Sequence, residues 1–168
     1  VLSGTVLFGQ ETETDVRTKA LSLSESQLLN EASRYTQDGF LYFAEILTDK
    51  LITIKPESPN YNYRKGFLAL EIRKDYLGAI PYLEKAVTSV SANYDMYSTR
   101  EEDAPTDAIF HLASCYHLDQ QIDKAEEYYK KFIAESKKNS ELIPVTNLRI
   151  TQCEVARKNI ATPVKVYL

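Results

Sequence analysis

The sequence predicts an all-α fold of three helical hairpins stacked side by side. The first observation is internal repetition: when Ala44, Ala79 and Ala125 are set in register, the residues around them agree in size and polarity. The second is that a further helical segment precedes each of these, with its own recurring pair of core residues. A hairpin of this kind cannot bury its apolar face alone, so neighbouring hairpins must share a continuous core.

Residues 1–20 are expected to form an N-terminal extension. The stretch 1–10 is small and apolar, and the sequence turns polar abruptly at Glu11. This boundary is typical of the end of a secretory signal, but also of a short strand or a tail, so both interpretations stay open. The apolar stretch is too short to span a bilayer.

The three repeats are expected over residues of about 25–58, 60–90 and 106–138. Each follows a helix-start signal. Ser24 and Gln27 form a capping-box pattern before the first repeat, and Ser58 followed by Pro59 offers a cap before the second. The segment Asp103–Thr106, which contains Pro105, takes the same place before the third repeat. Each hairpin is therefore expected to begin with a capped helix.

Close crossing of the two helices in a hairpin requires a small residue at the crossing point. The aligned pairs in the first helices are Ala32 with Tyr35, Phe67 with Leu70, and Ala113 with Tyr116. In the second pair the small residue is displaced by one position, to Gly66. Most of the 12 tyrosines are expected to be core residues. Tyr61, Tyr94 and Tyr97 lie outside the repeat pattern, and we expect them to be exposed.

Residues 91–105 are an insertion between the second and third repeats. Such an insertion either lengthens the flanking helices or forms a loop on one face, which is often the binding face. A capping helix is expected over about 141–158, with an apolar stripe that includes Leu148 and Val155 and covers the open end of the array. Residues 161–168 then alternate in polarity, as at the start of a linker or a following domain, so we expect an N-terminal module of a longer protein.

The composition excludes several function classes. A net charge of −4 argues against nucleic acid as a partner, and glycine-rich nucleotide loops are absent. His111 and His117 lie on different faces of one predicted helix, so they cannot form a metal pair. Cys115 and Cys153 are expected to be neighbours, either as a disulfide or, as we favour, as two buried thiols. The sequence therefore predicts no enzyme, no metal and no cofactor.

The repeats resemble the tetratricopeptide repeat, a helix-turn-helix unit of about 34 residues. The third repeat matches it best, at Ile109, Leu112, Ala113, Tyr116, Ala125 and Tyr129. The resemblance implies a right-handed superhelix whose first helices line a groove for a protein or peptide. The groove residues that it implies are Leu29, Ser33, Gln37, Tyr61, Arg64, Leu68, Glu71, Phe110, Ser114 and His117. Family members that bind chaperone tails carry Lys and Asn in this groove, and that clamp is missing here.

A narrower resemblance covers the third repeat and the capping helix. The segments 113–118, 123–129, 153–156 and 163–166 are similar to the N-terminal repeat region of large OmpA-type envelope proteins that also carry a β-propeller. This implies a non-catalytic scaffold module at the periplasm and outer membrane, where such proteins tether outer-membrane machinery, including type IX secretion, to peptidoglycan. Three alternatives stay open: a solenoid that packs only against other domains of its own chain, a cytoplasmic adaptor, and an accessory to an enzyme or an enzyme of unrecognised type.

Overall fold

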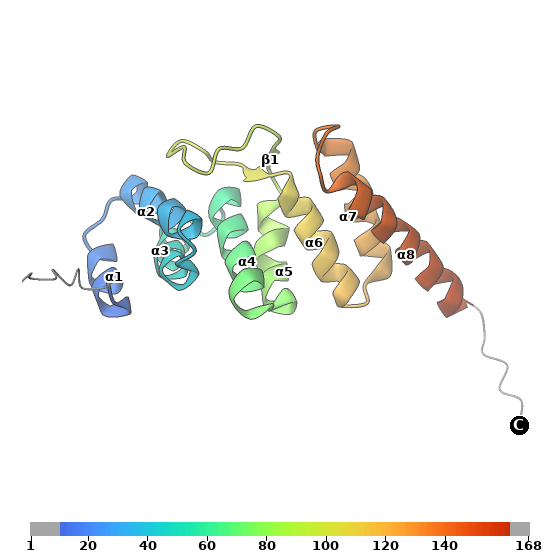
Figure 1. Cartoon of the computed structure of the whole chain (residues 1–168), viewed down its shortest axis with the longest axis horizontal. Coiled ribbons are helices and arrows are strands. Elements are labelled where there is room, and N and C mark those ends of the chain that lie inside the picture. The colour runs from blue at the N-terminus through green and yellow to red at the C-terminus, as the bar shows by residue number, and fades with distance from the viewer. Residues whose placement is uncertain (1–10, 162–168) are drawn as a thin grey trace, which may run out of the picture.

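The structure, a computed structural model, describes residues 11–161, which form helical hairpins laid side by side along one axis (Figure 1). The helices are α1 (Glu13–Ala20), α2 (Glu25–Gln37), α3 (Leu41–Ile54), α4 (Pro59–Arg73), α5 (Tyr76–Ala86), α6 (Asp107–Leu118), α7 (Ile122–Glu135) and α8 (Ile143–Ala161). The strands β1 (Val90–Ser91) and β2 (Ala104–Pro105) pair in parallel. From α2 onward, each helix packs against the next one along the chain. The fold is the all-α helical-repeat superhelix that the sequence predicts.

The hairpins α2–α3, α4–α5 and α6–α7 begin with the helix-start signals of the sequence, with one exception. Ser24 and Gln27 form a complete capping box on α2. The Ser58 side chain accepts a hydrogen bond from the Tyr61 amide, with proline in the first turn of α4. Thr106 makes no side-chain cap on α6, because its backbone is already helical. The expectation that the segment Asp103–Thr106 caps this helix with a side chain is therefore wrong.

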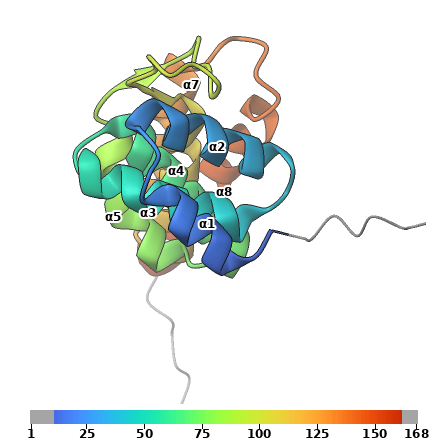
Figure 2. The same ribbon diagram turned by 90° about the vertical axis from the view of Figure 1, so that its left-hand side faces the viewer.

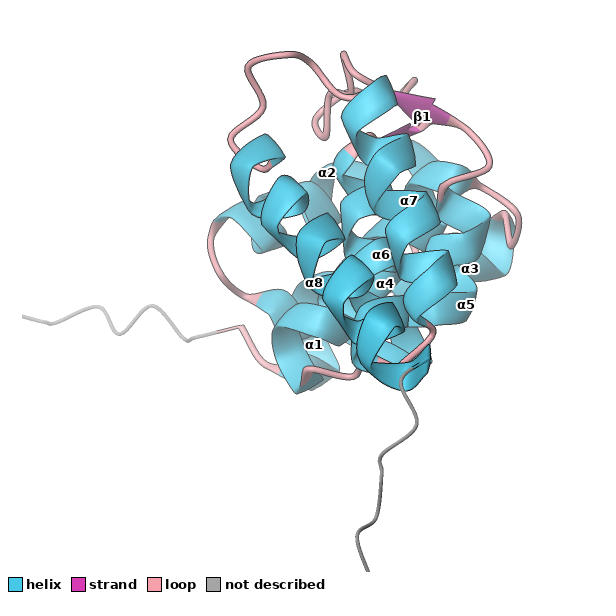
Figure 3. Ribbon diagram, turned by 90° about the vertical axis from the view of Figure 1, so that its right-hand side faces the viewer, coloured by secondary structure: helices cyan, strands magenta, loops and turns pink. Residues whose placement is uncertain are grey.

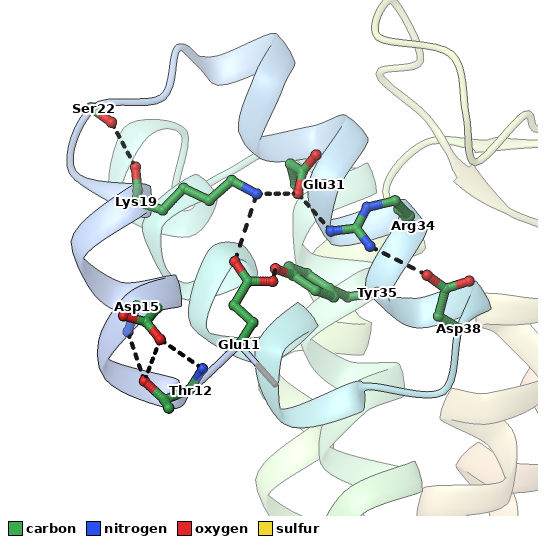
Figure 4. A network of polar contacts seen from close by, with 9 residues as sticks. All are labelled: Glu11, Thr12, Asp15, Lys19, Ser22, Glu31, Arg34, Tyr35 and Asp38. Atoms are coloured by element: carbon green, nitrogen blue, oxygen red, sulfur yellow. Dashed lines mark hydrogen bonds and ion pairs between the residues drawn. The ribbon is translucent and has the colours of Figure 1, made fainter. Parts of the chain in front are cut away.

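The N-terminal extension contains α1, a helix that the sequence analysis did not predict. Its start is a capping box in which Thr12 and Asp15 bond to each other's backbone amides. Val16 is fully buried where α1 packs on α3. Lys19 Nζ lies 2.7 Å from Glu31 Oε2 and ties α1 to α2 within a larger polar network (Figure 4). The extension is thus part of the packed array from Glu13 onward.

Two apolar clusters fill the array, and α4 contributes to both. The first cluster includes Val16, Leu28, Tyr35, Leu47, Leu51 and Leu68. The second includes Ala69, Leu83, Ile109, Leu112, Tyr129 and Phe132. The division falls between two consecutive residues of α4, because Leu68 belongs to the first cluster and Ala69 to the second.

Gly66 marks the point where α4 crosses α5. A Cβ atom built at Gly66 would lie 2.8 Å from Leu83 Cγ, so no side chain fits there without a shift of Leu83. Gly66 therefore corresponds to Ala32 and Ala113 in the other hairpins, and the alignment of Phe67 with those alanines is wrong by one position. Gly66 therefore fixes how the second repeat aligns with the other two, because the helix crossing requires a small residue whereas the residues beside it can vary.

The helix α8 presents a different face to the array from the one expected. Thr146 and Cys153 are fully buried, whereas Leu148 is 57% exposed and Val155 51% exposed. The expectation that Leu148 and Val155 cover the open end of the array is therefore wrong, because both lie on the solvent side of α8. Cys115 and Cys153 are both buried free thiols, as we favoured over a disulfide.

The expectations for residues 1–10 and 162–168 lie outside the described residues. Within the described part of the chain, no helix combines the length and the apolar character needed to cross a bilayer. End-on views show the 91–105 insertion gathered on one side of the array, next to the ends of the helices (Figures 2 and 3).

Candidate functional site

The helices α2, α4 and α6 form the surface that we call the inner face, and the 91–105 insertion lies across its first half. The carbonyl oxygen of Met96 accepts hydrogen bonds from Ser33 Oγ of α2 at 2.7 Å and from Arg64 Nη2 of α4 at 2.6 Å. Ser33 is 1% exposed and Arg64 is 6% exposed. The insertion is therefore a loop on one face, and it covers two of the expected groove residues.

Asn60, at the start of α4, is a second anchor for the insertion. Its Nδ2 donates to the carbonyl oxygen of Glu101 at 2.8 Å, and its backbone amide donates to that of Glu102 at 3.2 Å. Its Oδ1 accepts from Arg64 Nε at 2.9 Å and from the Tyr94 hydroxyl at 3.1 Å. Asn60 is fully buried, and every polar atom of its side chain has a partner.

The base of the insertion is held by the short ladder of β1 and β2. Val90 pairs with Ala104, and Ser91 pairs with Pro105. Ala104 is fully buried and belongs to the second apolar cluster. The loop therefore leaves and re-enters the array at one fixed point.

A small pocket of about 170 Å³ remains between the insertion and α4. Its lining residues are Thr36, Tyr63, Arg64, Phe67, Leu68, Tyr94 and Met96. Tyr63 and Tyr94 meet edge to face, with ring centroids 5.9 Å apart. Aromatic and thioether groups dominate these walls, as is typical of a pocket that accepts an apolar side chain.

The aromatic surface continues from α4 to α6 through His111. Its ring centroid lies 6.4 Å from that of Tyr63 and 6.0 Å from that of Phe67. Burial lowers the pKa of His111, although the carboxylates of Asp107 and Glu71 oppose this shift. His111 is therefore a neutral, aromatic member of the inner face.

Tyr63, Phe67, Tyr94 and His111 were not among the groove residues expected from the sequence. Gly66 was the signal that could have identified two of them. If Gly66 is aligned with Ala32 and Ala113, Tyr63 and Phe67 take the places that the sequence analysis gave to Arg64 and Leu68.

Tyr61 and Leu68 lie inside the array and not on an open groove. Leu68 is 1% exposed, within the first apolar cluster. Tyr61 is 5% exposed, and its hydroxyl donates to Glu25 Oε1 at 2.6 Å. Burial, with the neighbouring Glu25 carboxylate, raises the pKa of Tyr61. The expectation of an exposed Tyr61 is therefore wrong, whereas Tyr97 is exposed and Tyr94 is half-buried.

The other expected groove residues divide into two sets. Leu29 is buried in the first cluster, whereas Gln37 and Glu71 are exposed on α2 and α4. Phe110, Ser114 and His117 of α6 are half-buried against α7 and α8. The ring centroids of Phe110 and Phe132 are 5.7 Å apart. The Tyr129 hydroxyl lies 3.3 Å from Ser114 Oγ, and Cys153 Sγ lies 3.9 Å from His117 Nδ1. The structure therefore does not gather the expected residues into one groove, and their role in binding stays a prediction.

The cysteine and histidine side chains show little sign of activation for catalysis. Burial raises the pKa of the Cys115 thiol to about 12 and also raises that of Cys153, so both stay protonated at neutral pH. Burial lowers the pKa of His117. Over residues 11–161, no cluster of three or more His, Cys, Asp or Glu side chains is placed to hold a metal ion.

Solved structures share this arrangement of helices. The first tetratricopeptide-repeat domain of human RPAP3 is similar with a TM-score of 0.57 at 15% identity, over 85% of this chain and 98% of that domain. The chain has the tetratricopeptide-repeat fold. MamA from Desulfovibrio magneticus RS-1, from residue 41 to its end, has a TM-score of 0.56 at 19% identity, over 89% of this chain and 88% of that one. A double mutant of RS-1 MamA gives 0.55 at 19% identity, over 87% and 85%.

At these identities the likeness shows the fold alone. No family model matches the chain, and no curated protein matches its sequence.

Proposed function

We propose that this tetratricopeptide-repeat module binds protein, performs no chemistry, and acts as the interaction arm of a cell-envelope scaffold. The observation that carries the binding role is the pocket on the inner face, with walls formed by Tyr63, Phe67 and Tyr94. Aromatic side chains supply much of the binding energy in protein interfaces, and a pocket of this size accepts one apolar side chain of a partner.

The envelope role is supported by the resemblance of the third repeat and α8 to the repeat region of OmpA-type proteins. In this proposal the module lies at the periplasmic side of the outer membrane. Its partner belongs to outer-membrane machinery, such as the type IX secretion apparatus, that the rest of such a scaffold links to peptidoglycan. The partner is a protein and not nucleic acid, consistent with the net charge of −4.

Site-specific photo-crosslinking in the cells that produce the protein tests the binding role. A photoreactive amino acid replaces Glu71, which is exposed on the inner face, and in a matched chain it replaces Leu77, which is 53% exposed on α5. We expect a discrete cross-linked protein from position 71 that is absent from position 77. Equal labelling from both positions, or none from position 71, would contradict a partner on the inner face.

Fractionation of the same cells tests the location. We expect the protein and its cross-linked product in the periplasmic and outer-membrane fractions. Recovery of both from the cytoplasm would contradict the envelope role and support a cytoplasmic adaptor instead.

A second candidate function is a solenoid that packs against other domains of its own chain, and the outer side of α8 favours it. Leu148 and Val155 are apolar and about half exposed there, in positions that another domain would cover. A photoreactive residue at Leu148 distinguishes the two. A cross-link within the chain supports this candidate, and a cross-link to a separate protein supports an external partner.

A further inference from the structure

The repeats hold the 91–105 insertion by three main-chain carbonyl oxygens and by the side chain of Tyr94, which contacts Asn60 and Tyr63. The acceptors are the carbonyl oxygens of Met96, Glu101 and Glu102. The donors are Ser33, Asn60 and Arg64, which belong to α2 and α4. Because every peptide carries carbonyl oxygens, these donors do not require the sequence of the insertion. Another extended segment could therefore satisfy them.

On this surface, Arg64 donates hydrogen bonds to uncharged acceptors. Its three nitrogen atoms donate to Asn60 Oδ1, Ser33 Oγ and the Met96 carbonyl oxygen. Among the described residues, no carboxylate lies within ion-pair distance of its guanidinium. When the insertion moves away, water can reach Arg64 and replace the lost acceptor, so an open form is physically accessible.

The tip of the insertion, residues 92–103, is separable from the core. Most of its side chains are exposed, including Asp95, Tyr97 and Arg100, whereas Tyr94 and Met96 are half-buried beside the pocket. Among the described residues of both apolar clusters, none comes from the tip, whereas Val90 and Ala104 at its base pack in the second cluster. The tip can therefore leave the inner face while the base stays fixed.

We propose that the tip is a resident ligand: α2 and α4 form a binding site for the main chain of an extended peptide, and the chain's own residues 92–103 occupy it. A partner that binds there must displace the tip, which makes the insertion a competitor for the site. Displacement also removes the pocket walls that Tyr94 and Met96 supply, and it leaves Tyr63 and Phe67 of α4 to contact the partner. This inference rests on the proposed function only in assigning partner binding to the inner face.

The test supplies the tip as a separate molecule. A variant in which a short Gly-Ser linker replaces residues 92–103 is mixed with a fluorescent synthetic peptide of that sequence, and binding is followed by fluorescence anisotropy. We expect saturable binding to the folded variant and binding at least about tenfold weaker to the unaltered chain, whose site is filled. A folded variant that does not bind the peptide would overturn the proposal, and so would equal binding to both chains.

Two arginines of α4 provide matched controls in the linker variant. Arg64→Leu removes the donor at the site, and we expect peptide binding to weaken by about tenfold or more. Arg73→Leu removes an arginine that bonds to Glu45 of α3 and has no contact with the tip, and we expect binding to be unchanged. Equal losses from both substitutions would indicate non-specific attraction and contradict the assigned site.

Hydrogen exchange of the unaltered chain keeps the proposal testable if the linker variant does not fold. We expect the amides of residues 92–103 to exchange by local opening, much faster than the core amides of α4. Exchange of both only through global unfolding would show that the tip is a permanent part of the fold. A chain that cross-links a partner from position 71 but fails the peptide and exchange tests would overturn this inference and leave the proposed function intact.

Discussion

Along α2 and α4 the inner face is covered by a loop held by hydrogen bonds, whereas α6 packs against aromatic and sulfur-containing side chains of α7 and α8. In the first half, Asn60 and Arg64 are buried because the insertion supplies their acceptors. In the second half, Phe110 packs on Phe132 and His117 lies beside Cys153. A typical hydrogen bond contributes about 1 kcal/mol net, and a buried ring contributes several. Water can replace the partners of each hydrogen bond but not those of a buried ring, so we expect the first half to open more readily than the second.

The largest effect is expected in the second half. Phe132→Ala removes a fully buried ring, and we expect the free energy of unfolding in urea to fall by about 3–5 kcal/mol. Phe40→Ala is the matched control, because Phe40 is 53% exposed and should cost about 1 kcal/mol. Similar losses at the two positions would remove the contrast between the halves.

Asn60→Ala probes the first half. It removes the side-chain bonds to the Glu101 carbonyl oxygen and the Tyr94 hydroxyl, and we expect a loss of about 1–3 kcal/mol. Trypsin should also cleave after Arg100 faster than in the unaltered chain, as followed by the masses of the fragments. Asn30→Ala, at an exposed position on α2, is the control. Unchanged cleavage in the Asn60 variant would mean that other contacts hold the tip.

Glu45→Gln tests an ion pair that joins α3 to α4 in the first half. Hydrogen bonding to Arg73, and then to Lys65, lowers the pKa of Glu45 from 4.5 to about 2. The folded pKa is depressed, so the stabilisation is full above pH 4.5 and is lost as the pH falls toward 2. We expect the substitution to cost about 1 kcal/mol at pH 7, since Arg73 is partly exposed.

The difference between wild type and the Glu45 variant should shrink as the pH falls through that window in urea titrations. Glu13→Gln removes a solvent-exposed pair with Arg17 and should show almost no difference at any pH. A constant difference for the Glu45 variant would show that packing, and not charge, is responsible.

His111→Phe, at the boundary between the two halves of the array, should have the smallest effect on stability. Burial lowers the folded pKa of His111 below its ordinary 6.5, so the unfolded chain binds a proton more readily. The wild type should lose stability relative to the phenylalanine variant as the pH falls below 6.5. Thermal unfolding at neutral and mildly acidic pH measures this, and a pH-independent difference would contradict a buried neutral His111.

Local signals made the helices predictable. Ser24 with Gln27 and Ser58 with Pro59 indicated where α2 and α4 begin, because capping depends on residues a few positions apart. The same rule could have found α1, where Thr12 and Asp15 have the capping-box spacing. The face of α8 was misjudged because Thr146 and Cys153, which are small and weakly polar, fit the buried side better than Leu148 did.

The site was less predictable, because it depends on contacts between distant parts of the chain. Arg64 looks like a solvated surface residue, and its burial is favourable because it donates to Ser33 Oγ and the Met96 carbonyl oxygen, 31 and 32 residues away in the sequence. The insertion was recognised from repeat spacing, but spacing does not tell which face a loop covers. Tyr63 and Phe67 were hidden by a shift of one position at Gly66.

The division of the core between Leu68 and Ala69 has a mechanical consequence. If the module is pulled from its two ends, α4 carries the load from one apolar cluster to the other. Hairpins in such arrays interact mainly with their neighbours, so extension should release them one after another in discrete steps. A linker of this kind lengthens under tension before it breaks.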